Sequence, residues 1–126
     1  MVTWILWALI LAMLAWMGFN YLRIRRAAKI VDNEEFEALI RTGQLIDLRD
    51  PAEFHRKHIL GARNIPSSQL KTSLAALRKD KPVLLYENQR GQRVTNAALY
   101  LKKQGFSEIY ILSYGLDSWI GKVKTS

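Results

Sequence analysis

Hydrophobic residues are distributed in two different ways along this chain. Residues Val2 to Leu22 are almost all apolar and include no charged side chain. Built as a helix, they would span roughly 31 Å, which matches the hydrocarbon core of a membrane at about 30 Å. Tryptophan and tyrosine lie near both ends of the stretch, as is typical of helices that end at the two membrane interfaces. The pattern predicts a transmembrane anchor over residues 1–22.

A basic cluster, RIRRAAK from Arg23 to Lys29, follows the apolar stretch. A cleaved signal peptide would instead carry its basic residues before the apolar stretch and end in a small-x-small cleavage site. Because basic residues beside a membrane helix mark its cytoplasmic side, we expect a single pass through the cell membrane with the N-terminus outside. Residues 23–29 would then form a basic juxtamembrane linker that attracts the headgroups of the lipid bilayer.

From residue 30 onward, short apolar runs alternate with segments of helical periodicity. The apolar runs show no polar alternation, which is expected of strands that are covered on both faces. This order predicts one α/β domain over residues 30–126, with a mainly parallel central sheet flanked by helices. The expected strands are Ile30–Val31, Leu45–Leu48, Ala62–Ile65, Val83–Tyr86 and Ile109–Leu112.

The expected helices are marked by capping residues and glycine stops. Asp32 with Glu35 forms a capping-box pattern before one helix, and Asp50 with Pro51 opens another. We expect helices from Asp32 to about Gly43, from Asp50 to shortly before Gly61, from Ser67 or Ser68 to Leu77, from Val94 to Gln104, and a last turn over Leu116–Ile120.

Composition and charge narrow the function. The 126 residues carry a net charge of +8, and half of it comes from the juxtamembrane cluster. The domain itself is only mildly basic and has no known nucleic-acid motif, so no nucleic-acid partner is expected. The chain has no cysteine, which excludes disulfides, thiolate metal sites and cysteine nucleophiles. His55 and His58 have no carboxylates at metal-ligand spacing, so neither a metal nor another cofactor is expected.

Three motifs occur in the order typical of one family. The sequences DLRDPAEF from Asp47, HILGARNIP from His58 and GLDSW from Gly115 resemble the signature motifs of rhodaneses. This resemblance covers about residues 30–123 and implies a rhodanese-like fold. We expect Asp47 and Arg49 to pair or cap nearby backbone, His58 to bond to backbone, and Trp119 to lie in the core. The signature positions with an expected structural role are Asp47, Arg49, Glu53, Phe54, His58, Gly61, Ala62, Asn64, Pro66, Gly115 and Trp119.

The residue that carries rhodanese chemistry is missing. In active members of the family, a cysteine opens the loop after the central strand and carries sulfur as a persulfide, which backbone N–H groups and a helix N-terminus stabilise. Here that loop reads ENQRGQR. Alignment on Tyr86 puts Glu87 at the cysteine position, whereas alignment on Gly91 and Arg93 puts Asn88 there. Neither residue can form a persulfide, so no catalytic residue is expected.

The loop leaves several functions open. Its length resembles the cysteine-x5-arginine loop of rhodanese-related dual-specificity phosphatases, with glutamate in place of the nucleophile. It could bind a small anion, or Glu87 and Arg93 could fill the nest of N–H groups themselves. We favour a non-catalytic binding or regulatory module with an unidentified protein partner, ahead of a small-anion or phosphopeptide sensor and a residual sulfurtransferase or phosphatase. The candidate anion-binding residues are Glu87, Asn88, Gln89, Arg90, Gly91, Gln92 and Arg93.

Overall fold

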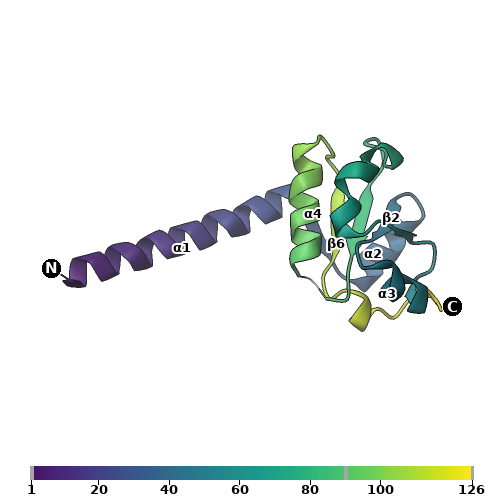
Figure 1. The fold of residues 1–126 in the computed structure, drawn as a ribbon, viewed down its shortest axis with the longest axis horizontal. Helices are drawn as coiled ribbons and strands as arrows, with labels where there is room; N and C mark the ends of the chain where they lie inside the picture. The colour runs from purple at the N-terminus through teal and green to yellow at the C-terminus, as the bar shows by residue number, and fades with distance from the viewer. Residues whose placement is uncertain (1, 90, 126) are drawn as a thin grey trace.

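The apolar N-terminal residues form one long helix that projects away from the rest of the chain (Figure 1). The computed structural model describes residues 2–89 and 91–125. In that part of the chain, one helical stretch, Val2–Leu22, is long and apolar enough to cross a membrane. The helix α1 (Val2–Ala27) continues through the segment expected to be a linker, and Ala27 and Ala28 are already buried in the domain. The helix therefore leads directly into the first strand.

The remaining elements alternate as the sequence predicts, with two additional short strands. After α1 the elements are β1 (Lys29–Val31), α2 (Asn33–Ile40), β2 (Gln44–Asp47), α3 (Pro51–Arg56), β3 (His58–Ile59), β4 (Arg63–Asn64), η1 (Ser67–Gln69), η2 (Lys71–Ala76), β5 (Val83–Tyr86), α4 (Gln92–Lys103), β6 (Ile109–Leu112), η3 (Leu116–Ser118) and β7 (Val123–Lys124).

Five of these strands form a parallel sheet in the order β1-β6-β5-β2-β4. Its central strand, β5, is buried along its whole length. Pairing between β2 and β5 sets Asp47 opposite Tyr86, so the two strands end at the same level. The loops that follow these strands consequently meet at one edge of the sheet. The predicted α/β fold with a mainly parallel sheet is confirmed.

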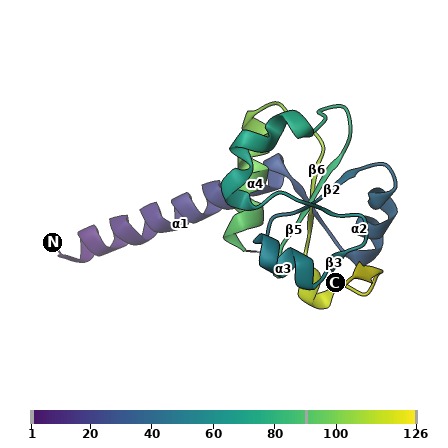
Figure 2. The ribbon, with the colours of Figure 1, turned by 45° about the vertical axis from the view of Figure 1, so that its right-hand side comes forward.

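Helices cover both faces of the sheet, with α4 on one side and α2 on the other (Figure 2). Side chains of β5 alternate between two apolar clusters: Val83 and Leu85 pack on the α4 side, while Leu84 and Tyr86 pack on the α2 side. Both clusters exclude water, which explains why the strand carries no polar residue. Phe36, fully buried, fixes α2 to its face of the sheet.

Several predicted boundaries and element types were wrong. The expected helix over residues 67–77 is instead two 3-10 segments, η1 and η2. Serine and threonine hydroxyls there compete for backbone carbonyls, as the Thr72 hydroxyl does when it donates to Gln69 O at 2.9 Å. Asp50 precedes α3 but its side chain makes no capping hydrogen bond. By contrast, Asp32 caps α2 by accepting from Glu35 N at 2.9 Å.

Candidate functional site

The loop after β5 encloses the carboxylate of its own first residue. Glu87 Oε2 accepts a hydrogen bond from Val94 N at 2.9 Å and another from Gly91 N at 3.2 Å. Val94 lies in the first turn of α4, where backbone N–H groups lack partners within the helix and the helix dipole favours negative charge. The carboxylate therefore occupies the place in the loop that suits an anion.

Gly115 and the first residues of η3 hold the backbone of this loop in place. Leu116 N donates to Glu87 O at 2.9 Å, and Asp117 N donates to Asn88 O at 3.0 Å. Gly115 has a φ of 70°, and a Cβ at this position would lie 2.4 Å from Asn88 O. Only glycine allows this close approach of the two backbones. The glycine of the third signature motif is thus needed to shape the loop after β5.

Asn88 points away from the N–H groups that surround the Glu87 carboxylate. Its Oδ1 accepts from Arg49 Nη1 at 3.0 Å, and its Nδ2 donates to Glu53 Oε2 at 2.7 Å. Of the two positions that alignment offers for the missing cysteine, Glu87 is the one whose side chain lies inside the loop. Asn88 instead connects the loop to β2 and α3.

Arg93 does not close the loop around Glu87. It lies 3.5 Å from Glu53 Oε1, measured from Nη1, and so forms an ion pair with α3. The hydrogen bond from Asn88 holds the pKa of Glu53 below its usual value, with further contributions from Arg93 and Arg49. The expectation that Glu87 and Arg93 jointly fill the nest was therefore wrong for Arg93, because a carboxylate of a neighbouring helix is its partner.

A buried ion pair at the end of β2 stabilises the site. Asp47 and Arg49 are 0% and 4% exposed, and Arg49 donates to both carboxylate oxygens of Asp47, including Nη2 to Oδ2 at 2.8 Å. Arg49 also donates to Lys57 O. Burial works against the charged guanidinium, but the bonds and charge of Asp47 outweigh it and raise the pKa of Arg49. The side chain of Asn64 completes the cluster by donating to Asp47 O and Arg49 O.

Tyr86 also belongs to this cluster, which no pattern in the sequence predicts. It is buried at the end of β5, and its hydroxyl accepts from Ile59 N at 3.1 Å. Burial, followed by the negative charge of Asp47, raises the pKa of Tyr86 and keeps it protonated. A tyrosine in an apolar strand resembles an ordinary core residue, so only the tertiary structure shows that its hydroxyl joins β5 to β3.

Other signature residues shape the surrounding backbone. His58 lies with Nδ1 2.7 Å from Phe54 O, and its ring stacks on Phe54 at 3.8 Å between centroids. Trp119 is half-buried and not a full core residue; it meets Phe36 edge-to-face at 5.8 Å. Gly61 adopts a φ of 90° in the turn before β4. The half-buried Ala62 packs against the α2-side cluster, and the buried Pro66 follows β4.

The rest of the candidate loop faces solvent. Gln89 is exposed and lies 3.4 Å from Asp117 Oδ2, measured from its Nε2, and Gln92 is exposed at the start of α4. Arg90 is outside the residues that the structure describes. An open pocket of about 300 Å³ adjoins the loop and is lined by Arg49, Glu53, Arg56, Lys57, Asn88, Leu116 and Asp117. Within residues 2–89 and 91–125, no three acidic or histidine side chains gather in a way that could hold a metal.

This arrangement of a loop between β5 and α4, supported by an Asp47–Arg49 pair, agrees with the comparison to known families. Residues 32–122 match the family described as Rhodanese-like domain. The chain belongs to the rhodanese-like family. It is 48% identical over 113 residues to the uncharacterized protein YqhL of Bacillus subtilis (strain 168), covering 90% of this chain and 89% of YqhL.

Other rhodanese-like proteins include enzymes. The chain is 37% identical over 92 residues to the thiosulfate sulfurtransferase GlpE of Stutzerimonas stutzeri (strain A1501), covering 72% of this chain and 84% of GlpE. Among solved structures, a rhodanese-related protein from Thermoplasma volcanium has a TM-score of 0.69 at 25% identity, covering 76% of this chain and 97% of that one. The family predicted from the three motifs is confirmed.

Proposed function

We propose that this rhodanese-like domain is non-catalytic and acts as a binding or regulatory module at the cytoplasmic face of the cell membrane. The observation that carries the proposal is the Glu87 carboxylate, which accepts hydrogen bonds from Gly91 N and Val94 N inside the loop after β5. We infer that Glu87 stands where active relatives have their cysteine. The anion-stabilising N–H groups persist, but a fixed carboxylate uses them.

Sulfur transfer needs a nucleophile that this chain does not have. A thiolate attacks a sulfane sulfur and keeps it as a persulfide, whereas a carboxylate is a poor nucleophile for sulfur. The charge of Glu87 would also repel thiosulfate from the loop. With no cysteine anywhere in the 126 residues, no other thiol can replace it. On this proposal the chain keeps the rhodanese-like fold, and Glu87 stabilises the loop but does not transfer sulfur.

A sensor for small anions receives less support from the geometry. A bound anion would need the N–H groups of Gly91 and Val94, which already bind Glu87. Two of the cations beside it are also occupied, since Arg93 pairs with Glu53 and Arg49 with Asp47. Binding would therefore have to displace internal carboxylates that are held at high effective concentration. A protein partner that contacts the outer surface of the site does not have to displace these carboxylates.

The pocket beside the loop is our candidate contact for a protein partner. Its lining includes the cations Arg49, Arg56 and Lys57 and the carboxylates Glu53 and Asp117, so its surface offers charges of both signs. Arg56 and Lys57 are exposed and carry no catalytic or scaffold role in our account. Such a mixed polar surface resembles the rim of an interface more than a small-molecule pocket, which is usually apolar.

The membrane location rests on α1. Its apolar stretch has the length of a membrane span, its side chains are exposed, and a basic cluster follows it. The similarity to YqhL extends over more residues than the domain contains, so it includes part of this helix. An anchor confines the domain to the membrane surface, where its effective concentration for membrane-bound partners is raised.

Two assays test the proposal on the full-length protein. We expect no turnover of thiosulfate with cyanide above a buffer blank, and turnover by the wild type would overturn the non-catalytic role. Crosslinking in native membranes should capture a partner with wild type and much less of it with Arg56→Glu/Lys57→Glu. The matched variant Lys122→Glu/Lys124→Glu changes exposed lysines of the C-terminal segment and should capture as much as wild type. Equal capture by all three proteins would exclude the pocket as the contact.

A further inference from the structure

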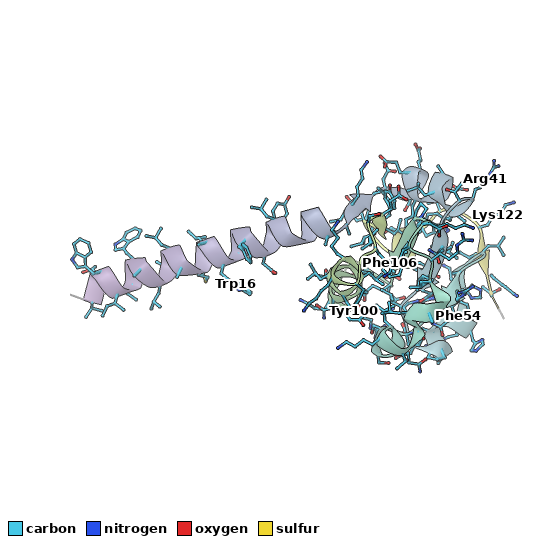
Figure 3. The ribbon with its side chains drawn as sticks, turned by 90° about the horizontal axis from the view of Figure 1, so that it is seen from above. Trp16, Arg41, Phe54, Tyr100, Phe106 and Lys122 are labelled. Atoms are coloured by element: carbon cyan, nitrogen blue, oxygen red, sulfur yellow. The ribbon has the colours of Figure 1, made fainter. Side chains whose placement is uncertain are left out.

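One side of the domain faces the anchor, and α4 forms much of it (Figures 1 and 2). Tyr100 on α4 lies on the side from which α1 emerges, whereas Arg41 and Lys122 lie on the opposite side (Figure 3). Because Ala27 and Ala28 are buried, no exposed loop separates α1 from the domain. The five residues that follow Leu22, up to Ala27, rise roughly 8 Å. Because α4 contacts α1, it lies near any membrane that α1 crosses.

The two segments that form much of this side carry only positive charge. The sequence of α4, Gln92–Lys103, contains no carboxylate, and neither does the neighbouring segment 66–79 that forms η1 and η2. The exposed cations of the two segments include Lys71, Lys102 and Lys103. The helix on the opposite face of the sheet is acidic instead, since α2 carries Glu34, Glu35 and Glu37. The helices on the two faces of the sheet therefore carry charge of opposite sign, α4 positive and α2 negative.

Two carboxylates lie close to these segments, and Glu108 lines a pocket together with Ala27 and Ala28 where α1 enters the domain. Asp80 and Glu108 belong to the loops that precede β5 and β6, at the amino-terminal edge of the sheet. Asp80 is also bound to Arg78, with 2.6 Å between Nη2 and Oδ2, which offsets its charge. The two carboxylates reduce the positive charge of the α4 side but do not cancel it, because five exposed cations outnumber them: Lys71, Arg78, Lys79, Lys102 and Lys103.

An aromatic residue lies among these cations. Lys71 Nζ is 5.5 Å from the centroid of the Tyr100 ring, which links η2 to α4. A shallow groove of about 290 Å³ runs between the two segments, and Lys71, Asn96 and Tyr100 contribute to its lining. Tyrosine and lysine both favour the interface between water and lipid, where an apolar stem or ring and a polar tip are accommodated together.

We propose that the surface formed by α4 and η1–η2 binds the anionic headgroups of the membrane that α1 crosses. This inference rests on the membrane anchor of the proposed function and specifies how the domain is oriented beneath it. The roughly 8 Å between the end of the apolar span and the domain is within about one Debye length, so charges at this level of the domain are not fully screened from the headgroups. In this orientation α2 and α3, with the pocket beside the Glu87 loop, remain open to partners.

The absence of cysteine allows a direct test with single labels. Asn96→Cys places a fluorophore on the exposed side of α4, and Arg41→Cys places one at the end of α2 on the far side. Full-length protein is reconstituted in vesicles of phosphatidylcholine with phosphatidylserine, or of phosphatidylcholine alone, that contain headgroup-nitroxide lipid. We expect strong quenching at position 96 and weak quenching at position 41 in the anionic vesicles. Without phosphatidylserine, or in high salt, quenching at position 96 should fall toward that at 41.

A charge series separates docking from simple proximity to the anchor. Each lysine near an anionic surface shifts the docked-to-undocked ratio roughly fivefold, so Lys71→Gln/Lys102→Gln/Lys103→Gln should lower it roughly a hundredfold. The matched variant Arg41→Gln/Lys122→Gln/Lys124→Gln removes three charges away from α4 and should leave quenching at position 96 unchanged. Equal quenching in both lipid mixtures, or equal loss in both charge variants, would overturn the docking. Loss of the protein from vesicles in carbonate would instead overturn the anchor itself.

Discussion

Glu87 brings a carboxylate into a loop whose N–H groups would otherwise need an external anion. In our proposal it takes the place of a thiolate, which acquires sulfur during a reaction cycle, whereas a carboxylate does not. The two hydrogen bonds that Glu87 accepts connect the end of β5 to the start of α4. At this position, the side chain has therefore become part of the structure that holds the loop.

Replacement of Glu87 by glutamine tests this structural role. Glu87→Gln keeps an acceptor oxygen but loses the charge, so we expect the free energy of unfolding to fall by about 1–2 kcal/mol. Denaturant unfolding of the full-length protein measures the change, with the exposed Glu108→Gln as the control. A loss below about 0.5 kcal/mol, typical of surface substitutions, would show that the carboxylate does not stabilise the loop.

Glu53 should make stability depend on acid pH. Its pKa in the folded protein lies below the usual 4.5, chiefly because Asn88 donates to it. A lowered pKa stabilises the fold above the unfolded value, and this contribution is lost as the pH falls through the folded value. We therefore expect Asn88→Ala to destabilise the protein more at pH 7 than at pH 3. The denaturant midpoints of wild type and Asn88→Ala at pH 7 and at pH 3 provide the measurement. An equal loss of stability at the two pH values would contradict the link between Asn88 and the pKa of Glu53.

At the scale of elements, sequence patterns correctly predicted the features that depend on interactions between residues close together in the chain. Asp32 and Glu35 marked the start of α2 correctly because the capping bond joins residues three apart. The leucines of η1–η2 were misleading, since a spacing of three and four residues fits an apolar face in more than one helix type. The antiparallel pair β3–β7 had no local signal at all. It joins two-residue strands that are far apart in the chain.

Gly115 provides a test of how the turn before η3 supports the site. Gly115→Ala should lower the free energy of unfolding by more than about 2 kcal/mol, because the new Cβ meets Asn88 O and the positive φ adds strain. Gly61→Ala is the matched control, since Gly61 also has a positive φ but open space around its Cβ. Thermal or denaturant unfolding compares them. Similar losses in both variants would mean that the contact with the Asn88 backbone is unimportant.

For the whole molecule, the sequence specified the family and the order of elements but not how the site is connected. The Asp47–Arg49 pair was predictable because its members are two positions apart at the end of a strand. The link from Arg49 through Asn88 to Glu53 and Arg93 was not, because it joins four segments that meet only in the folded domain. The same tertiary contacts explain why Arg93 forms an ion pair with Glu53 of α3 and not with Glu87.

The orientation of the chain in the membrane is testable independently of the domain. Because the basic cluster follows the apolar helix, a reporter fused after Ser126 should behave as cytoplasmic. Replacing Arg23, Arg25 and Arg26 with glutamine should increase the fraction with the opposite orientation, whereas replacing Lys102 and Lys103, far along the chain, should not. Extraction of the native protein by carbonate or high salt would contradict the membrane span.

The most direct test of the central claim asks which position of the loop can carry sulfur. Wild type, Glu87→Cys and Asn88→Cys are incubated with thiosulfate, and mass spectrometry measures the intact proteins. A cysteine thiolate that attacks the outer sulfur of thiosulfate releases sulfite and retains one sulfur as a persulfide. We predict that only Glu87→Cys gains this sulfur, because its side chain alone faces Gly91 N and Val94 N. Sulfur gained by Asn88→Cys but not by Glu87→Cys, or turnover of thiosulfate by the wild type, would contradict a site in which Glu87 has replaced the catalytic cysteine.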